Sequence, residues 1–484
     1  MTRHSKGVVA AGHRLTAEAG AAMLREGGNA VDATIAALAM ACVCEPVLAS
    51  PGGGGFAMLR DGSSGDTTLL DFFPQTPLVR CGDSETGFRH IHADFGATTQ
   101  RFHIGPATVA TPGFFDGIDA LSQQGASFSL ADLFAPAIAA AADGVEISPY
   151  QYYLATVVEP ILTATKASRN LFAPDGDLQS AGELFNNPGL SETFRDVAAN
   201  GWTQTDIPDQ ILREQSLDGH LTKVDLESYH VEERQPVSLT LGGAKVFLNP
   251  LPAASGTLIR HALAHLQNCT PLSLATALNE ADQARLSARG DLSVLLDRPI
   301  RQQGTTHISA IDADGNACAV TVSNGAGSGE MVGEHGFMLN NILGEEDVNP
   351  HGSCDWPLDT RLASMMCPTL IDTSDGGLIA LGSGGSSRIR SAVFQTVVRL
   401  CLEGQGLAGA IDAPRLHVED GHLDFEGHFS GDDTRQLTSA FPDHRLWPER
   451  NMFYGGVHAV FSDGTGNLAG KGDSRRDGSV AIAQ

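Results

Sequence analysis

The residue best placed to do chemistry is Thr305, at the start of an alternating β-branched run that ends at Ile311. A second such run extends from Ala317 to Ser323, and the residues between the runs are rich in Asp, Gly and Asn. This pattern predicts an antiparallel hairpin. If a three- or five-residue loop joins the runs, Ile311 faces Ala317 and Thr305 faces Ser323. Gly304, directly before Thr305, places no side chain beside the threonine amide.

A threonine hydroxyl is a weak nucleophile without a base, and this segment offers no obvious His or carboxylate partner. Cleavage of the Gly304–Thr305 bond would free an α-amino group with a pKa of about 7.7–8.0, which could act as base within the same residue. The uncut hydroxyl could attack the preceding carbonyl, which would make the cleavage autocatalytic. The alternative is an ordinary Thr-rich buried strand, which Gly-Thr-Thr alone favours.

A glycine-rich segment near the C-terminal end is the second candidate for chemistry. A hairpin predicted over Leu370–Leu381 leads into Gly382-Ser383-Gly384-Gly385-Ser386-Ser387, and a helix is predicted from there to Gly404. Such a loop presents backbone N–H groups and the positive end of a helix dipole. It could hold a phosphate or an oxyanion. With a threonine nucleophile in the same chain, the oxyanion role is favoured.

The elements that must position these residues begin with two helices. The first is predicted over Thr16–Arg25, and the second is capped by Asn29 and runs to Pro46. The glycines of 52–55 follow, and a close backbone approach is favoured over a phosphate loop because no Gly-Lys-Ser/Thr is present. Between residues 100 and 300 the pattern is mainly helical, with a kink or break expected at Pro160.

The segment His90-Ile91-His92-Ala93-Asp94 could present two imidazoles and a carboxylate to a metal ion. Further ligands are needed for such a site, so a solvated loop is favoured. No metal and no cofactor is expected. The eight cysteines are scattered, and free buried thiols are favoured over disulfides or zinc ligands.

Composition narrows the functional classes. The chain has 484 residues, 42% hydrophobic and 18% charged, and no evident linker, which favours one large folded body. A net charge of −26 argues against nucleic acid and anionic membranes as partners. The first residues lack the apolar core of a signal peptide, and no stretch is long and apolar enough to span a bilayer. We therefore expect a cytoplasmic protein.

Ordered motifs along nearly the whole chain resemble the γ-glutamyltranspeptidase family of N-terminal-nucleophile hydrolases. They are Glu26-Gly27-Gly28-Asn29-Ala30-Val31-Asp32-Ala33, Gly52-Gly53-Gly54-Gly55-Phe56, Pro112-Gly113, Thr305-Thr306-His307-x-Ser309 with Asp314-Gly315-Asn316, Leu339-Asn340-Asn341, Pro368-Thr369, Gly382-Ser383-x-Gly385-x-x-Arg388-Ile389 and Gly472-Asp473-x-Arg475.

The resemblance implies an α+β fold, a four-layer αββα sandwich. It also implies a single precursor cut before Thr305, so that residues 1–304 form a large subunit and residues 305–484 a small one. The two would stay intertwined as a heterodimer in one globular body, with further oligomerisation left open. The partner implied is a small-molecule amide substrate.

Carried over by position, Thr305 would be the nucleophile and, through its amine, the base. The backbone N–H groups around Gly385 and Ser386 would form the oxyanion hole, and Gly384 shares that role in one alignment of the loop. Ser323 matches a hydroxyl position that contacts the nucleophile's end of the site.

The substrate side departs from the family pattern. Where relatives that take γ-glutamyl compounds have Asp-Phe-Arg-Glu, this chain has Asp71-Phe72-Phe73-Pro74, so Phe73 replaces the arginine that binds the α-carboxylate. The usual Ser-Ser pair is Ala363-Ser364 here, and a Gln of the amino-group pocket is Ile342. Glu345 could stand in for the acidic partner of the substrate ammonium. Asn324 lies one position from the expected Asn.

Loss of the bidentate guanidinium predicts poor binding of a glutathione-like donor. The alternative is that another arginine, such as Arg60 or Arg80, reaches the same place. The resulting hypothesis is an autoprocessed amidohydrolase or acyltransferase whose donor is not classical glutathione. A glutaryl acylase like the cephalosporin acylases, a small-amide hydrolase and a catalytically inactive binding or scaffold relative are the alternatives. A nucleotide-binding protein is remote, because the Lys and acidic metal ligands are missing.

Overall fold

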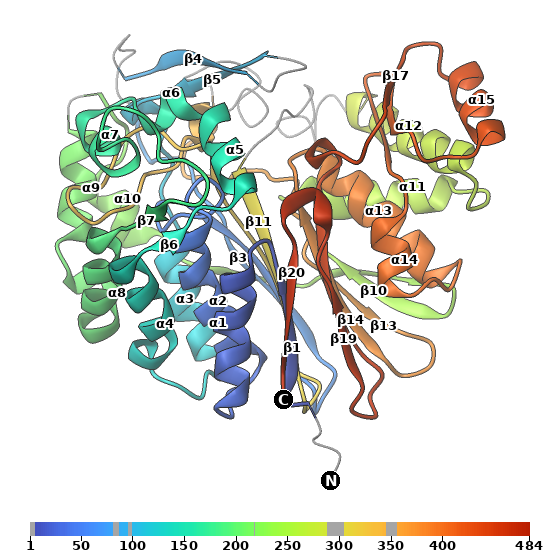
Figure 1. Ribbon diagram of the computed structural model, residues 1–484, viewed down its shortest axis with the longest axis horizontal. Coiled ribbons are helices and arrows are strands. Elements are labelled where there is room, and N and C mark those ends of the chain that lie inside the picture. Colours follow the sequence, from blue (N-terminus) through green and yellow to red (C-terminus); the bar gives the residue numbers. More distant parts are fainter. Residues whose placement is uncertain (1–4, 81–86, 95–98, 217, 288–303, 345–355) are drawn as a thin grey trace.

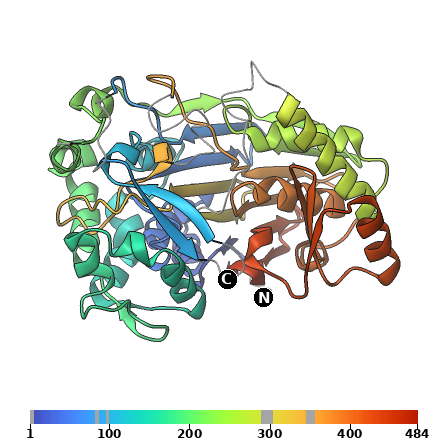
Figure 2. The ribbon, with the colours of Figure 1, turned by 90° about the horizontal axis from the view of Figure 1, so that it is seen from above.

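Two stacked antiparallel sheets lie between two layers of helices in the computed structural model (Figures 1 and 2). The structure describes the whole chain except residues 1–4, 81–86, 95–98, 217, 288–303 and 345–355, and the side chains of 93, 94, 99 and 100. The strand order is β20-β1-β11-β12-β2-β3-β8 in the seven-stranded sheet and β19-β18-β14-β13-β10-β9 in the six-stranded sheet. The expected α+β four-layer sandwich is confirmed.

The strands of the seven-stranded sheet are β1 (Gly7–Ala11), β2 (Gly54–Arg60), β3 (Thr67–Phe72), β8 (Glu232–Arg234), β11 (Gly304–Asp312), β12 (Ala317–Gly325) and β20 (Ser479–Ala483). Those of the six-stranded sheet are β9 (Val237–Leu241), β10 (Ala244–Leu248), β13 (Thr369–Asp372), β14 (Leu378–Gly384), β18 (Gly456–Ser462) and β19 (Leu468–Lys471). Three small sheets contain β4 (Arg89–Asp94) with β5 (Thr99–Ile104), β6 (Val145–Glu146) with β7 (Leu184–Phe185), and β15 (Leu416–Glu419), β16 (His422–Glu426) and β17 (His444–Trp447).

Figure 1 shows one helix group beside the seven-stranded sheet: α1 (Arg14–Arg25), α2 (Ala30–Cys44), α3 (Phe114–Gln123), α4 (Leu130–Asp143) and α8 (Pro188–Asn200). The group on the other side comprises α11 (Ala254–His265), α12 (Pro271–Ser287), α13 (Arg388–Cys401) and α14 (Leu407–Asp412). The remaining helices are α5 (Pro149–Val157), α6 (Glu159–Leu162), α7 (Lys166–Phe172), α9 (Ile207–Gln215), α10 (Lys223–Ser228) and α15 (Gly431–Ala440).

The second helix explains how the first layer is anchored. Every residue of α2 is buried, as its nearly all-apolar sequence predicts. Asn29 accepts the N–H groups of Val31 and Asp32, and the Asp32 carboxylate accepts the Asn29 N–H at 2.8 Å. This capping box confirms the predicted helix start. The expected break at Pro160 is also present, because α5 ends at Val157 and α6 begins at Glu159.

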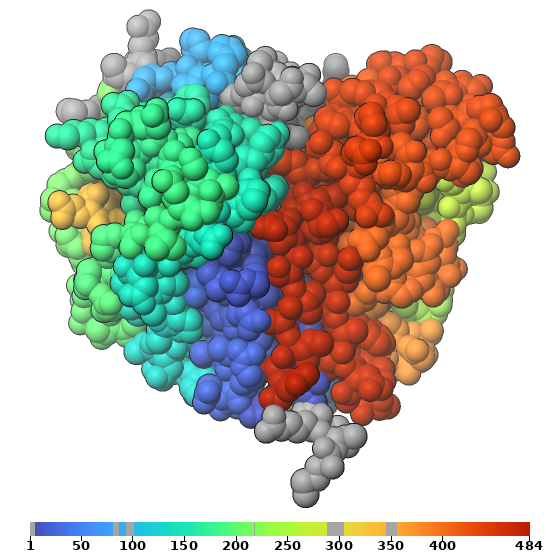
Figure 3. Space-filling model, in the orientation of Figure 1, coloured from blue at the N-terminus to red at the C-terminus, as the bar shows by residue number. Residues whose placement is uncertain are grey.

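Both sheets combine strands from the two sides of the Gly304–Thr305 bond. In the first sheet β11 and β12 lie between β1 and β2, and in the second β10 pairs with β13. Figure 3 shows the N-terminal and C-terminal surfaces, blue and red, meeting along the middle of the molecule. A cut before Thr305 would therefore leave the pieces joined by backbone ladders. Among the described residues, no helix is long and apolar enough to cross a membrane.

The glycine run of 52–55 is a close backbone approach, as predicted. A Cβ placed on Gly53 or Gly55 would lie 2.2 Å from the carbonyl oxygen of Ser323 or Thr321, respectively. The loop prediction for residues 90–94 is wrong, because they form β4 and pair with β5. The exposed His90 and His92 side chains gave no apolar alternation from which this strand could be predicted.

Candidate active site

The β11–β12 hairpin has the predicted register, with Ile311 opposite Ala317 and Thr305 opposite Ser323. At its open end the register shifts, because Gly304 pairs with Gly325. Asn324 is therefore an extra residue on β12, a β-bulge located opposite the Gly304–Thr305 bond. Bulges of this kind re-aim side chains and are common beside active sites.

A chain of hydroxyl groups connects the candidate nucleophile with the carbonyl of the bond before it. Thr305 Oγ1 donates to Ser323 Oγ at 3.3 Å, and Ser323 Oγ donates to the Gly304 carbonyl oxygen at 2.5 Å. The Gly325 N–H donates to Ser323 Oγ at 3.0 Å and fixes its position. Thr305 is only 3% exposed in the uncut chain, so it is not open to an external substrate.

The residue before Thr305 has no room for a side chain. A Cβ placed on Gly304 would lie 2.3 Å from the Val47 carbonyl oxygen and 2.6 Å from that of Gly325. Both contacts are with backbone atoms, which cannot move aside as a side chain can. Glycine is thus required here by the packing around the bond.

The nearest histidine on the same strand is not available as a base for Thr305. His307 hydrogen-bonds through its two ring nitrogens to Thr321 Oγ1 and Ser309 Oγ, each at 2.8 Å. Burial lowers the pKa of His307 well below its ordinary value, with a further lowering from His458. The imidazole is therefore neutral, and both of its nitrogens are occupied within the seven-stranded sheet, because Ser309 belongs to β11 and Thr321 to β12.

The glycine-rich loop lies directly against Thr305. A Cβ placed on Gly384, the last residue of β14, would lie 2.2 Å from the Thr305 carbonyl oxygen. Gly385 and Ser386 follow with φ values of +122° and +56°, and α13 begins at Arg388. Among the described residues, the backbone N–H groups of Gly385 and Ser386 have no hydrogen-bond acceptor. Two free donors before a helix start suit an oxyanion.

Two buried side-chain atoms near this hairpin and loop also lack partners among the described residues. They are Ser386 Oγ and Asn324 Oδ1. The Asn324 amide nitrogen donates to the Met338 carbonyl oxygen at 3.4 Å, which fixes the amide with its oxygen free. An unpaired buried polar atom costs about 1–3 kcal/mol. A bound substrate could supply the missing partners.

Arg476 is a charged residue of the site that the sequence analysis missed. Its Nη1 lies 3.4 Å from the Cβ position of Gly384, and its Nη2 lies 3.2 Å from that of Gly385. The side chain is 4% exposed, and Nε donates to the Met452 carbonyl oxygen at 3.3 Å. A buried cation here adds to the positive potential of the loop. The sequence signal was weak, because the matched motif ends at Arg475.

On the predicted substrate side, Phe73 is 3% exposed and its ring stacks on Phe56 with centroids 5.5 Å apart. It follows β3, which is three strands from β11 in the sheet order, or about 14 Å. The Tyr229 hydroxyl donates to the Phe73 carbonyl oxygen at 3.0 Å. The phenyl ring belongs to the packed core between the sheets.

Neither Arg60 nor Arg80 replaces the missing guanidinium. Arg60 pairs with Asp372 at 3.0 Å at the far end of β2, about 20 Å from Gly54. Arg80 lies over the Trp356 ring at 5.1 Å. The guanidinium that does reach Phe73 comes from Arg361, which sequence reasoning could not identify.

Arg361 is already engaged by the protein. Its Nη1 donates to the Phe73 carbonyl oxygen and the Tyr229 hydroxyl, and its Nη2 donates to the His230 carbonyl oxygen at 2.5 Å. Its Nε lies 3.8 Å from an Asp71 carboxylate oxygen. A substrate carboxylate would have to displace these partners.

Two of the remaining predicted substrate residues have neighbours elsewhere in the described part of the chain. Ser364 Oγ accepts the Met366 N–H at 3.1 Å, and Ser364 forms an isolated bridge with Ala253. Ile342 is buried in the core between the sheets. Glu345 lies outside the described residues. The structure therefore brings together Thr305, Ser323, Asn324 and the loop of residues 384–386.

Comparison with known proteins agrees with this geometry. The sequence matches the family profile of Gamma-glutamyltranspeptidase over residues 16–289 and 273–483. The Glutathione hydrolase proenzyme of Bacillus subtilis (strain 168) is 26% identical over 481 residues, covering 85% of this chain and 80% of that protein. The Acylase ACY 1 proenzyme of Pseudomonas sp. (strain SE83) is 26% identical over 540 residues, covering 99% of this chain and 94% of that protein.

Comparison with solved structures leads to the same group of proteins. The crystal structure of cephalosporin acylase from Bacillus halodurans superposes with a TM-score of 0.83 at 23% identity, covering 99% of this chain and 96% of that one. At this identity the likeness concerns the fold. The family profile, in contrast, covers most of the sequence. The chain therefore belongs to the gamma-glutamyltranspeptidase family and is an enzyme of the hydrolase and transpeptidase type.

Proposed function

We propose that this enzyme is made as a proenzyme, cuts itself before Thr305 and then uses Thr305 as the nucleophile on a small amide substrate. The observation that carries the proposal is the hydroxyl chain from Thr305 through Ser323 to the Gly304 carbonyl oxygen. Through the Ser323 hydroxyl, this chain connects the attacking oxygen, Thr305 Oγ1, with the carbonyl group that it would attack. That arrangement favours an active enzyme over an inactive binding or scaffold relative.

In the uncut chain Thr305 has no free amine, so Ser323 performs both proton transfers. As Thr305 Oγ1 bonds to the Gly304 carbonyl carbon, its proton passes to Ser323 Oγ, and the Ser323 proton passes to the carbonyl oxygen. The C–N bond then breaks as the hydroxyl group on the tetrahedral carbon gives its proton to the Thr305 nitrogen, and an ester to the Thr305 oxygen remains. Water hydrolyses this ester to a Gly304 carboxylate and a free Thr305 hydroxyl.

In turnover the freed Thr305 amine takes the hydroxyl proton, and Oγ1 attacks the substrate amide carbonyl. The N–H groups of Gly385 and Ser386, supported by the position of Gly384, receive the developing oxyanion. The leaving amine departs with a proton. Water or an acceptor amine then releases the acyl group from Thr305.

The two products would be a large subunit of residues 1–304 and a small subunit of residues 305–484. Strands from both segments pair within each sheet, which supports a heterodimer that stays together after the cut. The relatives from B. subtilis and Pseudomonas are also described as proenzymes.

The acyl donor is proposed to differ from a classical γ-glutamyl compound. Phe73 offers no charge to a substrate α-carboxylate, and the Arg361 guanidinium beside it is occupied. A glutaryl-like donor is the second candidate, because it is a γ-glutamyl group without the α-amino group and therefore needs no partner for an ammonium. The similarity to an acylase over 99% of the chain favours the same candidate.

The donor is tested with matched chromogenic anilides. We expect the γ-glutamyl anilide to have a kcat/KM at least 10-fold below that of the glutaryl anilide. The γ-glutamyl group carries an additional ammonium, and Ile342 offers it no hydrogen bond where relatives have a Gln. A hydrogen bond to a charged group is worth about 1.5–3 kcal/mol, or roughly 10- to 150-fold. Phe73→Arg should raise kcat/KM for both anilides, because both carry the carboxylate that a guanidinium binds, and Phe56→Leu controls for loss of ring packing. Efficient turnover of the γ-glutamyl anilide by the native enzyme would refute the donor assignment.

Ser323→Ala tests the hydroxyl chain. We expect self-cleavage to slow by roughly 100-fold or more, because a positioned proton-transfer group contributes about 10²–10⁴-fold. Ser323→Thr keeps a hydroxyl at the same position and serves as the matched control. The rate is followed as the loss of full-length chain on denaturing gels. Cleavage of Ser323→Ala at the native rate would exclude Ser323 from the reaction.

A further inference from the structure

Glu45 is a buried carboxylate on the side of β11 away from Thr305, and the reaction steps above do not use it. It follows α2 directly and is fully buried. Its Oε1 accepts the Thr16 hydroxyl at 2.8 Å, and its Oε2 accepts the Thr306 hydroxyl at 2.7 Å. The carboxylate thus connects α1 with the residue that follows the nucleophile.

The backbone of Glu45 holds the other side of the bond to be cut. Its carbonyl oxygen accepts the N–H groups of Leu48 at 2.8 Å and Ala49 at 2.9 Å. The turn formed in this way contains Val47, whose carbonyl oxygen lies 2.3 Å from the Cβ position of Gly304. Glu45 therefore contacts Thr306 by its side chain and fixes the turn that abuts Gly304.

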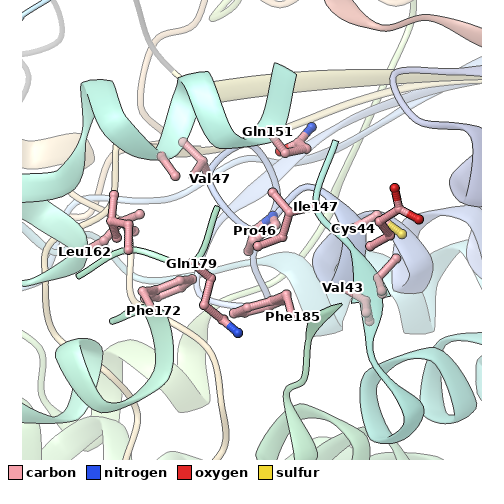
Figure 4. A pocket seen from close by; sticks show the side chains of 14 residues that line it. Val43, Cys44, Pro46, Val47, Ile147, Gln151, Leu162, Phe172, Gln179 and Phe185 are labelled. Atoms are coloured by element: carbon pink, nitrogen blue, oxygen red, sulfur yellow. The ribbon is translucent and has the colours of Figure 1, made fainter. Parts of the chain in front are cut away.

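This arrangement has little room for adjustment. A Cβ placed on Gly12 would lie 2.6 Å from Glu45 Oε2 and 2.8 Å from Thr306 Oγ1, so Gly12 packs directly on that hydrogen bond. The neighbours Cys44, Pro46 and Val47 line an apolar pocket of about 540 Å³, its open mouth included (Figure 4). Glu45 does not line this pocket, because its carboxylate is directed to Thr306 and Thr16.

We propose that Glu45 is a positioning residue for self-cleavage: its ionised carboxylate accepts the Thr16 and Thr306 hydroxyls and thereby holds the Gly304–Thr305 bond in place for attack by Thr305. This inference rests on the proposed function. An ionised carboxylate can accept from both hydroxyls at once. A protonated carboxyl group has a donor on one oxygen, so one hydroxyl must reorient its own proton.

Glu45 gains its proton at a pH within the physiological range. Burial raises its pKa to about 7, although the Thr306 and Thr16 hydrogen bonds act in the opposite direction. The groups that interact with it are Cys42 and Cys44 of α2, Tyr150 of α5, and Asp477. Burial raises the pKa of both thiols well above their ordinary value and that of Tyr150 to about 12, so these three stay neutral.

The uncut chain allows a clean test, because Thr305 then has no free amine to titrate. Burial lowers the pKa of His307 well below its ordinary value and that of His458 to about 4. As pH falls below about 7, the ionised fraction of Glu45 falls about tenfold per pH unit. We therefore expect self-cleavage to be fast above pH 8 and to slow about tenfold for each unit below pH 7.

The experiment uses full-length chain made by cell-free translation and transferred to buffers from pH 5.5 to 8.5, with the cleavage rate followed on gels. Glu45→Gln should cleave more slowly at pH 8, with a rate that varies less than twofold over this range. Thr16→Val removes one hydrogen bond to the charged form, so the fall in rate should move to higher pH. A merely structural role of Glu45 predicts neither change.

If Glu45→Gln keeps the native pH dependence, or if Thr16→Val does not shift it, the assignment is wrong. If Glu45→Gln fails to fold, the shift in Thr16→Val decides alone. A native chain that stays uncut at every pH would instead refute self-cleavage itself. That result can be told apart from the failure of Glu45 as its positioning residue.

Discussion

Thr305→Ala should leave one uncut chain of 484 residues, 50.7 kDa, with amide hydrolysis reduced roughly 1,000-fold or more. The substitution removes the oxygen that we propose attacks in both self-cleavage and turnover. No other described group can replace it, since Ser323 Oγ is bound to the Gly304 carbonyl oxygen and to the Gly325 N–H. Cleavage is read by denaturing gel and intact mass, and hydrolysis with the anilide that the native enzyme prefers.

Thr305→Ser is the matched control, because it keeps both the hydroxyl and, after cleavage, the α-amine. We expect this variant to be cut at the same bond and to retain activity within about tenfold of the native enzyme. Loss of self-cleavage in the alanine variant with its survival in the serine variant would identify the hydroxyl as the essential group. Normal cutting of Thr305→Ala would contradict the mechanism.

Gly384→Ala is the second substitution from which we expect a large loss of activity. The added Cβ would lie 2.2 Å from the Thr305 carbonyl oxygen, where a carbon atom cannot be accommodated, so β14 and β11 must move apart. This displaces the proposed oxyanion loop and the proposed nucleophile together. Overpacking of this kind costs about 1–3 kcal/mol of stability. Turnover should fall roughly 100-fold, as expected when oxyanion donors are misplaced.

Gly406→Ala is the control for Gly384→Ala. A Cβ there meets no atom within 4 Å, and its φ of −69° suits any residue. We expect native activity and a change in the free energy of unfolding below about 1 kcal/mol. Alanine is a poorer helix N-cap than glycine, but it also lowers the conformational entropy of the unfolded chain. Stability is measured by urea unfolding and activity with the same anilide. Equal activity of the two variants would mean that Gly384 does not position the loop against Thr305.

The elements that could be predicted from the sequence are those that depend on the pattern of neighbouring residues. The β11–β12 register follows from alternation and turn length, and the start of α2 follows from Asn29 and Asp32, three residues apart. The close approach of the glycine run was predictable because the phosphate-binding signature was missing. Each of these features depends on residues close together in the chain.

The features that could not be predicted depend on contacts between distant segments. Glu45 and Thr306 are 261 positions apart, and Arg361 reaches Phe73 across 288 positions. The reach of a long side chain cannot be deduced from its position in a sequence. The bulge at Asn324 could not be predicted from the residues around it either. It arises because Gly304 pairs with Gly325 while Thr305 pairs with Ser323, which leaves Asn324 without a partner on β11. These contacts decide which groups meet at the site.

The most direct test of self-cleavage at Thr305 is intact mass together with N-terminal sequencing of the purified protein after incubation at pH 8. We predict two chains that copurify, residues 1–304 and residues 305–484, with Thr305 as the first residue of the shorter chain. A single chain that persists through long incubation, or a new N-terminus at any other residue, would contradict this account.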